Sequence, residues 1–310
     1  MRRAFLIYNP ASGRRRAKRT QDIARVVEVL RAAGVETETC ATTHAGSAIQ
    51  QVQEAMSRGF DTVVSCGGDG TANEVLNGIM RSSADVALGL VPLGSGNLLA
   101  SDLKLPSDPA EAAQKLLTYQ PREFRPGLIS SQGVSGQEKR YFLVAAGVGA
   151  DAELMYRTEV EAKEFWGRNA YFLEMARMAL RRRYPMFHVE WEDEQGTRQQ
   201  GEAMLAMAVR AGKFPGLLTL VNLGTSLLRH DFCLLLFRTN KVRRFLSYFA
   251  GVATGRNWKV QDVDAIHTRW FRGTAIAGMP AIHSQADGEL LGTLPAELSI
   301  ESRPVKLLME

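Results

Sequence analysis

Cysteine is scarce in this chain of 310 residues, and its scarcity argues against several kinds of protein. The three cysteines, Cys40, Cys66 and Cys233, are widely spaced, odd in number and form no CxxC pair. This disfavours a disulfide framework and a cysteine-ligated metal cluster, and it favours a reducing compartment. The five histidines show no metal-ligand spacing either, so we expect structural or surface roles for them.

Long apolar runs are also lacking. No window approaches the ~18 apolar residues of a membrane-spanning helix. The run at 4–8 follows Arg2-Arg3 but is too short for a secretory signal, and Asn9-Pro10 ends it. We therefore expect a soluble, cytoplasmic protein whose contact with membranes is peripheral.

The net charge alone does not identify the class of binding partner. The net charge is +5 and the sequence pI is about 9.2. This modest basic excess suits nucleotide phosphates, an anionic membrane surface and nucleic acid alike. No nucleic-acid-binding motif accompanies the charge, so no nucleic-acid partner is expected.

Strand-like and helix-like patterns alternate over the first hundred residues, which predicts an α/β domain with a parallel sheet. Ile23, Val26 and Leu30, for example, share one helical face, and Gly34 follows as a stop signal. Ligands of such sheets bind at the carboxyl ends of the strands. Strands are expected at 4–8, 35–42, 61–66 and 86–91, and helices at 17–33, 47–58, 71–81 and 95–103.

The pattern changes after about residue 122, near Pro126 and Gly127. The length already favours two domains, and the second is predicted to be rich in antiparallel β-structure. The expected limits are 1–122 for the first domain, with 299–310 returning to complete it, and 123–298 for the second. Strands of the second domain are expected at 141–148, 186–192, 203–209, 217–221 and 232–237, and helices at 152–182 and 241–253.

A glycine cluster follows the third expected strand, where residues 66–78 read CGGDGTANEVLNG. A glycine-rich turn between strand and helix exposes backbone N–H groups and lets a phosphate approach closely. The cluster is neither a Walker A loop nor GxGxxG. The carboxylate of Asp69 would repel a phosphate unless a cation bridged them, which suggests Mg²⁺. The alternative is a tight turn in which Asp69 caps the helix expected at 71–81.

Two further turns end strands in the same way. Residues 92–97 read PLGSGN, and residues 9–13 read NPASG. Each turn alone is also explained as a strand-to-helix connection, with Ser95 or Asn97 as the N-cap in the first. Because the carboxyl ends of parallel strands lie along one edge, three such turns together predict a nucleotide site.

Two other glycine motifs have competing explanations. Asp287-Gly288 between apolar-bearing segments is the commonest hairpin signal, which is the favoured explanation when the motif is taken alone. Residues 147–152 fit GxGxxA after a strand. A dinucleotide site would need a second strand ending in an acidic residue about 20 positions later. A helical pattern stands there instead, so this interpretation is rejected.

Two basic runs stand out, at 14–19 and 181–183. Such runs are usually solvated faces. The first begins a helix directly after the 9–13 turn, so part of it is a candidate for phosphate contact. The second ends a long apolar helix and is a candidate for contact with lipid headgroups.

Taken together, these elements resemble the diacylglycerol kinase catalytic-domain family, and most closely its bacterial lipid kinase branch. The order and spacing of six elements carry the resemblance, which spans most of the chain. They are NPASG at 9–13, TTHAG at 42–46, GGDGTANEVLNG at 67–78, PLGSGNLLA at 92–100, GVGADAE at 147–153 and DGELLGTLPAELSI at 287–300. The resemblance implies a Rossmann-like α/β domain followed by a β-sandwich-like domain, with the active site in the cleft between them.

The resemblance also implies an ATP- and Mg²⁺-dependent lipid kinase that acts at a membrane surface on diacylglycerol or a related lipid alcohol. Glu289 would accept the proton of the lipid hydroxyl, with Asp287 beside it, and Asp69 would work with Mg²⁺ at the phosphates. A homodimer is a possible assembly. The residues implied in ATP binding are Asn9, Thr42, Gly67, Gly68, Gly70, Thr71, Asn73, Glu74, Gly94, Ser95 and Asn97.

One segment departs from the family pattern. Bacterial members often carry a loop like PxAxxxDG, whose aspartate and backbone carbonyls hold a structural Mg²⁺. The matching region at 221–232 reads VNLGTSLLRHDF, with His230 at the place of the aspartate and Asp231 beside it. Leu227, His230 and Phe232 are the matching positions, and we assign no metal to them.

Two alternatives stay open. An NAD kinase-like enzyme shares the fold and a GGDG loop but would phosphorylate a soluble dinucleotide, and Asp287-Gly288-Glu289 favours the lipid kinase over it. A non-catalytic lipid- or nucleotide-binding homologue is supported by the altered segment at 221–232. The presence of both Asp69 and Glu289 argues against that homologue.

Overall fold

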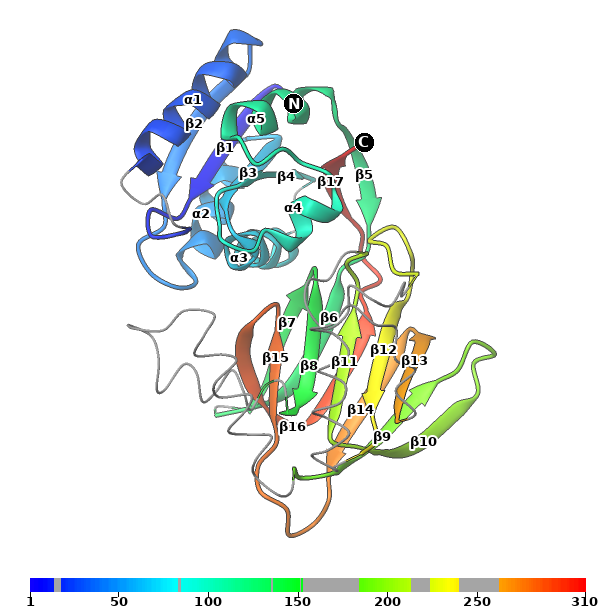
Figure 1. Cartoon of the computed structure of the whole chain (residues 1–310). Coiled ribbons are helices and arrows are strands. Elements are labelled where there is room, and N and C mark those ends of the chain that lie inside the picture. Colours follow the sequence, from blue (N-terminus) through cyan, green and yellow to red (C-terminus); the bar gives the residue numbers. More distant parts are fainter. Residues whose placement is uncertain are drawn as a thin grey trace, which may run out of the picture. The chain divides into compact units, whose positions relative to one another are not determined.

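The computed structural model divides the chain into two compact units, Met1–Pro126 with Glu301–Glu310, and Gly127–Ile300. Both appear in Figure 1. The helices expected at 152–182 and 241–253, the strand expected at 217–221 and the arginines at 14–16 and 181–183 lie outside the described residues. The described residues are 1–13, 18–82, 85–134, 136–150, 152, 184–212, 224–239 and 262–310.

The first unit is built on a sheet of six strands in the order β2-β1-β3-β4-β17-β5. Neighbours from β2 to β17 are parallel, and β5 runs antiparallel to β17. Every residue of β3 and β4 is buried, as expected for strands covered on both faces. The strands are β1 (Arg3–Tyr8), β2 (Glu36–Ala41), β3 (Thr62–Gly67), β4 (Ala87–Pro92), β5 (Gln120–Phe124) and β17 (Val305–Met309).

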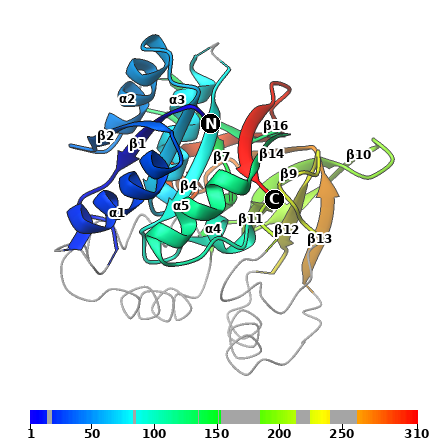
Figure 2. The same cartoon turned by 90° about the horizontal axis from the view of Figure 1, so that it is seen from above.

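Helices cover both faces of this sheet, with α1 and α5 on one face and α2 and α3 on the other (Figure 2). Gly34 and Gly59 follow α1 and α2 with positive φ, the conformation that ends helices most cheaply at glycine. Asp108 caps α5 by accepting hydrogen bonds from Ala110 and Glu111. The helices are α1 (Arg19–Ala32), α2 (Ser47–Ser57), α3 (Asp69–Met80), α4 (Leu98–Asp102) and α5 (Pro109–Thr118).

The strand order fixes where a ligand is expected. The chain runs from β1 outward to β2, then returns past β1 to β3, so the order changes direction between β1 and β3. Ligands of doubly wound sheets bind at such a switch point, at the carboxyl ends of the strands. The turns after β1, β2, β3 and β4 all lie at these ends.

The described residues of the second unit form one large antiparallel sheet of eleven strands. The main path is β10-β9-β14-β16-β15-β8-β11-β12-β13, and β6 joins it through β16 and carries β7. The predicted fold class, α/β followed by mainly antiparallel β, is confirmed. The strands are β6 (Gly127–Gly133), β7 (Gly136–Phe142), β8 (Ala145–Gly149), β9 (Phe187–Glu192), β10 (Arg198–Ala203), β11 (Leu205–Val209), β12 (Phe232–Phe237), β13 (Val263–Thr268), β14 (Trp270–Ala275), β15 (His283–Ala286) and β16 (Glu289–Ile300).

The packed face of this sheet is apolar and aromatic. Phe142, Phe187, Phe232 and Phe271 are fully buried and belong to one core cluster with aliphatic side chains from neighbouring strands. Burying such a side chain stabilises the fold by roughly 1.5–3 kcal/mol. This core includes residues of β15 and β16 and so supports their hairpin. Among the described helices, none combines the length and apolarity needed to cross a membrane.

Candidate functional site

The turns that follow the parallel strands are joined to each other by backbone hydrogen bonds. Thr42, after β2, donates its N–H to the carbonyl of Tyr8 at the end of β1, at 2.8 Å. Leu93 and Gly94, after β4, donate to the carbonyl of Gly67 at the end of β3, at 2.8 and 3.2 Å. The predicted convergence of these turns along one edge is therefore present within the first unit.

The turns after β3 and β4 approach each other through glycine backbone. A methyl group added at Gly94 would lie 2.4 Å from the Cα of Gly68 and 2.7 Å from Oδ1 of Asn97. One added at Gly67 would lie 2.5 Å from the hydroxyl of Thr71. Real side chains do not tolerate such distances, so Gly94 is required for the close contact of the two turns and Gly67 for the packing of Thr71 against the end of β3.

Asn97 shapes the second turn. Its side chain accepts a hydrogen bond from the N–H of Gly94 and donates one to the carbonyl of Gly94, each at 2.9 Å. Asn97 itself has φ of 51°, a conformation that asparagine tolerates better than most residues. Because residues 94–97 are used in this turn, α4 begins at Leu98 rather than at the expected residue 95. Ser95 is exposed at the tip.

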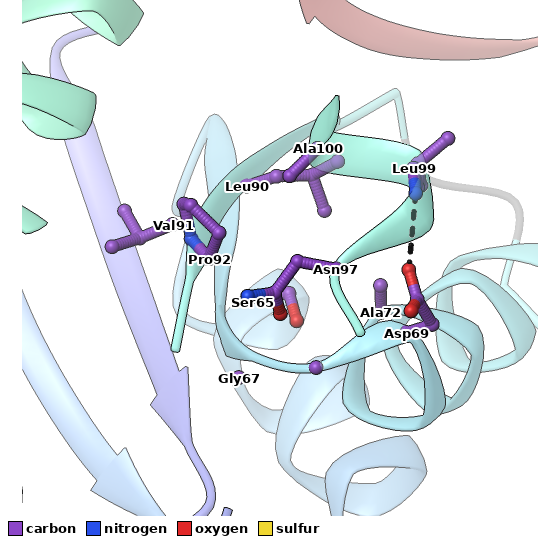
Figure 3. Close-up of a pocket in the computed structure, with 11 residues that line it drawn as sticks. Ser65, Gly67, Asp69, Ala72, Leu90, Val91, Pro92, Asn97, Leu99 and Ala100 are labelled. Carbon is purple, nitrogen blue, oxygen red and sulfur yellow. Dashed lines mark hydrogen bonds between the residues drawn. The ribbon is translucent and has the colours of Figure 1, made fainter. Parts of the chain in front are cut away.

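Asp69 lies at the start of α3 but caps a different helix (Figure 3). Its Oδ2 accepts a hydrogen bond from the N–H of Leu98 at 3.0 Å, and its Oδ1 accepts one from Leu99 at 3.1 Å. The alternative that Asp69 caps the helix after the glycine cluster is wrong, because α3 begins at Asp69 itself. The carboxylate instead fixes α4 against the glycine turn.

The amino end of α3 presents backbone N–H groups without a side-chain cap. Its N-cap residue is Gly68, which has no side chain to satisfy them. The first N–H groups of a helix have no partner within the helix, and the helix dipole favours an anion there. Gly68, Asp69 and Gly70 are partly buried, whereas Thr71 is buried beside Gly67. The geometry suits a phosphate group.

Arg19, the last residue of the basic run at 14–19, joins the turn after β1 to the turn after β4. Its guanidinium donates to the carbonyls of Ser12 and Leu93, the latter at 2.8 Å, and pairs with Asp22 at 3.6 Å. The side chain is buried. The end of the basic run thus holds two turns together instead of lying on a solvated face. Asn9 contributes within its own turn, where its Oδ1 accepts from the N–H of Ala11 at 2.8 Å.

Two predicted site residues of α3, Glu74 and Asn73, have hydrogen-bond partners within the first unit. Glu74 accepts hydrogen bonds from the N–H groups of Gly46 and Ala48, at 2.9 and 3.3 Å, and so holds the amino end of α2. Asn73 is buried and accepts from the side chain of Asn77. Glu74 thus supports the turn before α2, and the predicted contact of both residues with ATP stays a prediction.

A small hollow of about 210 Å³ lies among the turns (Figure 3). Its walls are largely apolar, so it is not the place of a triphosphate. The lining residues are Ser65, Gly67, Gly68, Asp69, Ala72, Leu90, Val91, Pro92, Asn97, Leu99 and Ala100.

The carboxylate near the glycine turns fits a Mg²⁺ ion that binds together with a nucleotide. Mg²⁺ is usually held by one or two carboxylates together with substrate phosphates, not by a protein cage. Asp69 supplies one such carboxylate beside the anion-binding end of α3. Within the described ranges, no group of three or more His, Cys, Asp or Glu side chains could hold a metal by itself.

In the second unit, Asp287 and Gly288 form the two-residue turn of the β15–β16 hairpin. Their φ values of 47° and 89° are those of a turn with both central residues left-handed. The Asp287 carboxylate accepts hydrogen bonds from the N–H groups of Leu143, Val144 and Ala145, at 2.7, 2.8 and 2.9 Å. The hairpin interpretation is confirmed, and Asp287 fixes the hairpin to the start of β8. Residues 147–149 lie in β8, which is antiparallel to both neighbours, so they form no dinucleotide motif.

Glu289 begins β16 directly after this turn. Its Oε2 pairs with Nη1 of Arg140 on β7 at 2.6 Å. The carboxylate is about one-third exposed and the guanidinium about one-fifth. Sequence reasoning missed Arg140, because nothing in the spacing of 140 and 289 signals their contact. The ion pair with Arg140 orients the Glu289 carboxylate.

The loop at 224–231 does not fit the structural Mg²⁺ that the family pattern implies. Position 230 is an exposed histidine. The carboxylate of Asp231 is held by Arg229 and by His267, the latter at 3.4 Å. The backbone carbonyl of Leu227, one of the matching positions, accepts a hydrogen bond from the guanidinium of Arg210 at 2.9 Å.

The predicted residues therefore fall into two groups. Those implied in ATP binding, with Asp69, belong to the first unit, and all of them lie in or beside its turns. Asp287 and Glu289 belong to one hairpin of the second unit. That the two groups act on one substrate stays a prediction.

Comparison with known proteins gives consistent matches. The diacylglycerol kinase catalytic domain matches residues 3–129. A protein of Bacillus subtilis (strain 168) named diacylglycerol kinase is 31% identical over 310 residues, which is 100% of this chain and 97% of that protein. A diacylglycerol kinase of Staphylococcus saprophyticus is 27% identical over 294 residues, 95% of this chain and 91% of that protein.

Solved structures agree at the level of the fold. The crystal structure of a diacylglycerol kinase from Bacillus anthracis str. Sterne matches with a TM-score of 0.70 at 17% sequence identity. The match covers 99% of this chain and 97% of that one. It extends over both units, so the succession of an α/β unit and a large antiparallel sheet is shared.

Proposed function

The chain belongs to the diacylglycerol kinase family and is a lipid kinase, and on that premise we propose that it transfers the γ-phosphate of ATP to the hydroxyl of diacylglycerol or a related lipid alcohol. The observation that carries the nucleotide half of the proposal is the close contact of two glycine turns beside the uncapped end of α3. Mg²⁺ is the proposed cofactor. In this proposal the first unit binds the nucleotide and the second unit binds the lipid.

The phosphate chain would lie against the glycine turns. Phosphoryl transfer needs little covalent chemistry from the protein, because positioning and neutralisation of charge supply most of the catalysis. The N–H groups at the start of α3 and the hydroxyl of Thr71 or Ser95 are suited to hold phosphate oxygens. Asp69 would hold Mg²⁺, which offsets negative charge on the phosphate groups when bound. The contacts of Asp69 with Leu98 and Leu99 keep its carboxylate in place for this role.

Glu289 is the proposed proton acceptor. An alcohol has a high pKa, so the base need not ionise it beforehand but takes its proton late, a contribution of typically ~10²–10⁴-fold. The ion pair with Arg140 would hold the carboxylate in one orientation toward the acceptor hydroxyl. Asp287 positions the hairpin that carries the base, through its three backbone hydrogen bonds.

The acceptor places the reaction at a membrane surface, because diacylglycerol and its relatives reside in bilayers. The net charge of +5 favours association with anionic lipid headgroups over association with neutral ones. We therefore propose a cytoplasmic protein that binds membranes peripherally. The proposed partners are ATP and a lipid, without nucleic acid, and a homodimer is compatible with the proposal.

Transfer of label from γ-labelled ATP tests the proposal. The purified protein is incubated with Mg²⁺ and vesicles containing diacylglycerol, a sphingoid base or ceramide in separate reactions, with free NAD in a fourth. Labelled phosphatidic acid is the expected product, and label in NAD would support the NAD kinase-like alternative instead. ATP binding without label in any acceptor would support the non-catalytic alternative.

A matched pair of variants tests the metal role. Asp69→Asn keeps an oxygen that can accept a hydrogen bond from α4 but removes the charge. We expect it to need about tenfold more Mg²⁺ for half-maximal rate. The exposed Asp85 serves as the control position, and Asp85→Asn should leave the Mg²⁺ requirement unchanged. Equal Mg²⁺ requirements for both variants would argue against Asp69.

A further inference from the structure

Arg210 is a buried cation outside the proposed active site. It follows β11 directly and is 1% exposed. Its Nη1 donates to the backbone carbonyls of Arg229 and Asp231, at 3.2 and 2.9 Å, and its Nη2 donates to that of Leu227, at 2.9 Å. Three carbonyl oxygens of one loop thus converge on one positive group.

The remaining contacts of the loop at 224–231 are consistent with a loop held around the Arg210 guanidinium. Thr225 donates its hydroxyl to the carbonyl of Ala211 at 2.7 Å, which ties the start of the loop to the residue after Arg210. At its end, the carboxylate of Asp231 is held by Arg229 and His267. Burial lowers the pKa of Arg210 to about 10, against the raising effect of the Asp231 charge. The guanidinium is therefore charged at neutral pH.

Backbone carbonyls that turn inward around one point are the ligands of hard divalent cations in proteins. A guanidinium can also satisfy such inward-facing carbonyls, because it is a permanent cation with five N–H donors in a fixed plane. It is also more weakly hydrated than an ammonium group, so its burial costs less. The loop carbonyls of this chain are satisfied by such a group.

We propose that the Arg210 guanidinium takes the place of a bound divalent cation in holding the loop at 224–231. The loop at 224–231 then keeps its conformation without a resident metal ion. The sequence of the loop is consistent with this replacement. The positive side chain of Arg210 takes the role of the ion, and the loop has no carboxylate at position 230.

The same residue links the loop to the proposed catalytic hairpin. The backbone N–H of Arg210 donates to the carbonyl of Val144 at 2.9 Å. The N–H of Val144 donates in turn to the carboxylate of Asp287 at 2.8 Å. Arg210 therefore stands between the loop and the turn that precedes Glu289.

The experiment compares thermal unfolding and amide hydrogen exchange of the full chain in EDTA and in excess MgCl₂, without nucleotide. For the wild-type protein we expect melting temperatures that agree within about 1 °C and equal exchange at 224–231 in both conditions. A melting temperature that falls by several degrees in EDTA and recovers with Mg²⁺ would overturn the proposal, because it would reveal a resident metal.

Arg210→Met removes the cation but keeps an apolar side chain of similar length. We expect its melting temperature to fall by roughly 5–10 °C, with faster exchange at 224–231 in particular. Arg272→Met, at an exposed position on β14, is the matched control and should melt like the wild type. If Arg210→Met fails to fold, Arg210→Lys is measured instead and should show the same local loss of protection to a smaller degree. Unchanged exchange at 224–231 in the variant that folds would contradict the proposal.

Discussion

At the scale of single residues, the ion pair between Arg140 and Glu289 decides how the proposed base faces its substrate. A carboxylate that rotates freely spends less time in the one orientation that reaches the acceptor oxygen. The pair holds Oε2 of Glu289 at 2.6 Å from the guanidinium. Arg140 is therefore a positioning residue whose effect should appear in turnover and not in nucleotide binding.

Arg140→Gln tests this role. We expect kcat to fall by about tenfold while KM for ATP stays within about twofold of its wild-type value. Arg140→Lys should recover part of the rate, because it restores a charged donor. Lys139→Gln, at the neighbouring exposed position of β7, is the control and should keep the wild-type rate. A rise in KM for ATP with unchanged kcat would speak against the assignment.

Asp231 makes stability depend on pH. Burial alone would raise the pKa of its carboxyl group, but the hydrogen bond and charge of Arg229, together with His267, hold that pKa below the ordinary value of 3.8. The carboxylate therefore stabilises the folded state above the unfolded pKa. This contribution is lost as the pH falls through the lowered folded pKa.

Asp231→Asn should consequently lower the melting temperature at about pH 7, and the difference from the wild type should shrink at about pH 3. Melting curves of both proteins across this range provide the measurement. A difference that grows on acidification would show that the sign of this contribution is wrong. The control is His188→Gln, which changes an exposed residue of β9.

At the scale of elements, the contact of the turns after β3 and β4 is sensitive to a single added methyl group. Gly94→Ala places a carbon 2.4 Å from Gly68 Cα, and the turns must separate to admit it. We expect a loss of about 1–3 kcal/mol in the free energy of unfolding and weaker ATP binding. Denaturant melts and nucleotide titrations measure both effects.

Gly96→Ala is the matched control in the same turn. Its added carbon would lie 3.4 Å from Oδ2 of Asp69, an ordinary van der Waals distance. It should change ATP binding much less than Gly94→Ala does. Equal losses from the two substitutions would show that the close contact of the turns is not what the nucleotide requires.

The local elements of the first unit could be predicted from sequence because their signals are local. Strand and helix periods, with glycine at the helix ends, place β1 to β4 and α1 to α3 close to the observed bounds. The hairpin at Asp287-Gly288 was likewise signalled by its own two residues. The helix α5 was not predicted, although Asp108-Pro109 is a helix-start signal.

The long-range partners could not be predicted, because they depend on which elements the fold brings together. Asp69 lies within a helix start, which suggests a local cap, yet it holds α4. Arg19 and Arg210 belong to basic or apolar stretches that give no sign of the carbonyls they meet. The contacts that could not be predicted join residues that lie apart in the sequence, whatever their residue types.

At the scale of the whole molecule, the family match extends over the entire chain, and its two halves carry complementary parts of the proposed reaction. The first unit has the glycine turns and Asp69, and the second has the hairpin with Asp287 and Glu289. In the proposed reaction, neither unit alone supplies both the nucleotide site and the base. The account therefore predicts that loss of Glu289 leaves nucleotide binding intact while it abolishes most of the transfer.

The rate of label transfer from γ-labelled ATP to diacylglycerol by Glu289→Gln is the most direct measurement of that claim. The control is Glu297→Gln, which changes an exposed carboxylate on the same strand. We expect the Glu289 variant to bind ATP normally and to transfer label ~10²–10⁴-fold more slowly than the control. Equal rates for the two variants, with both proteins folded, would contradict the account.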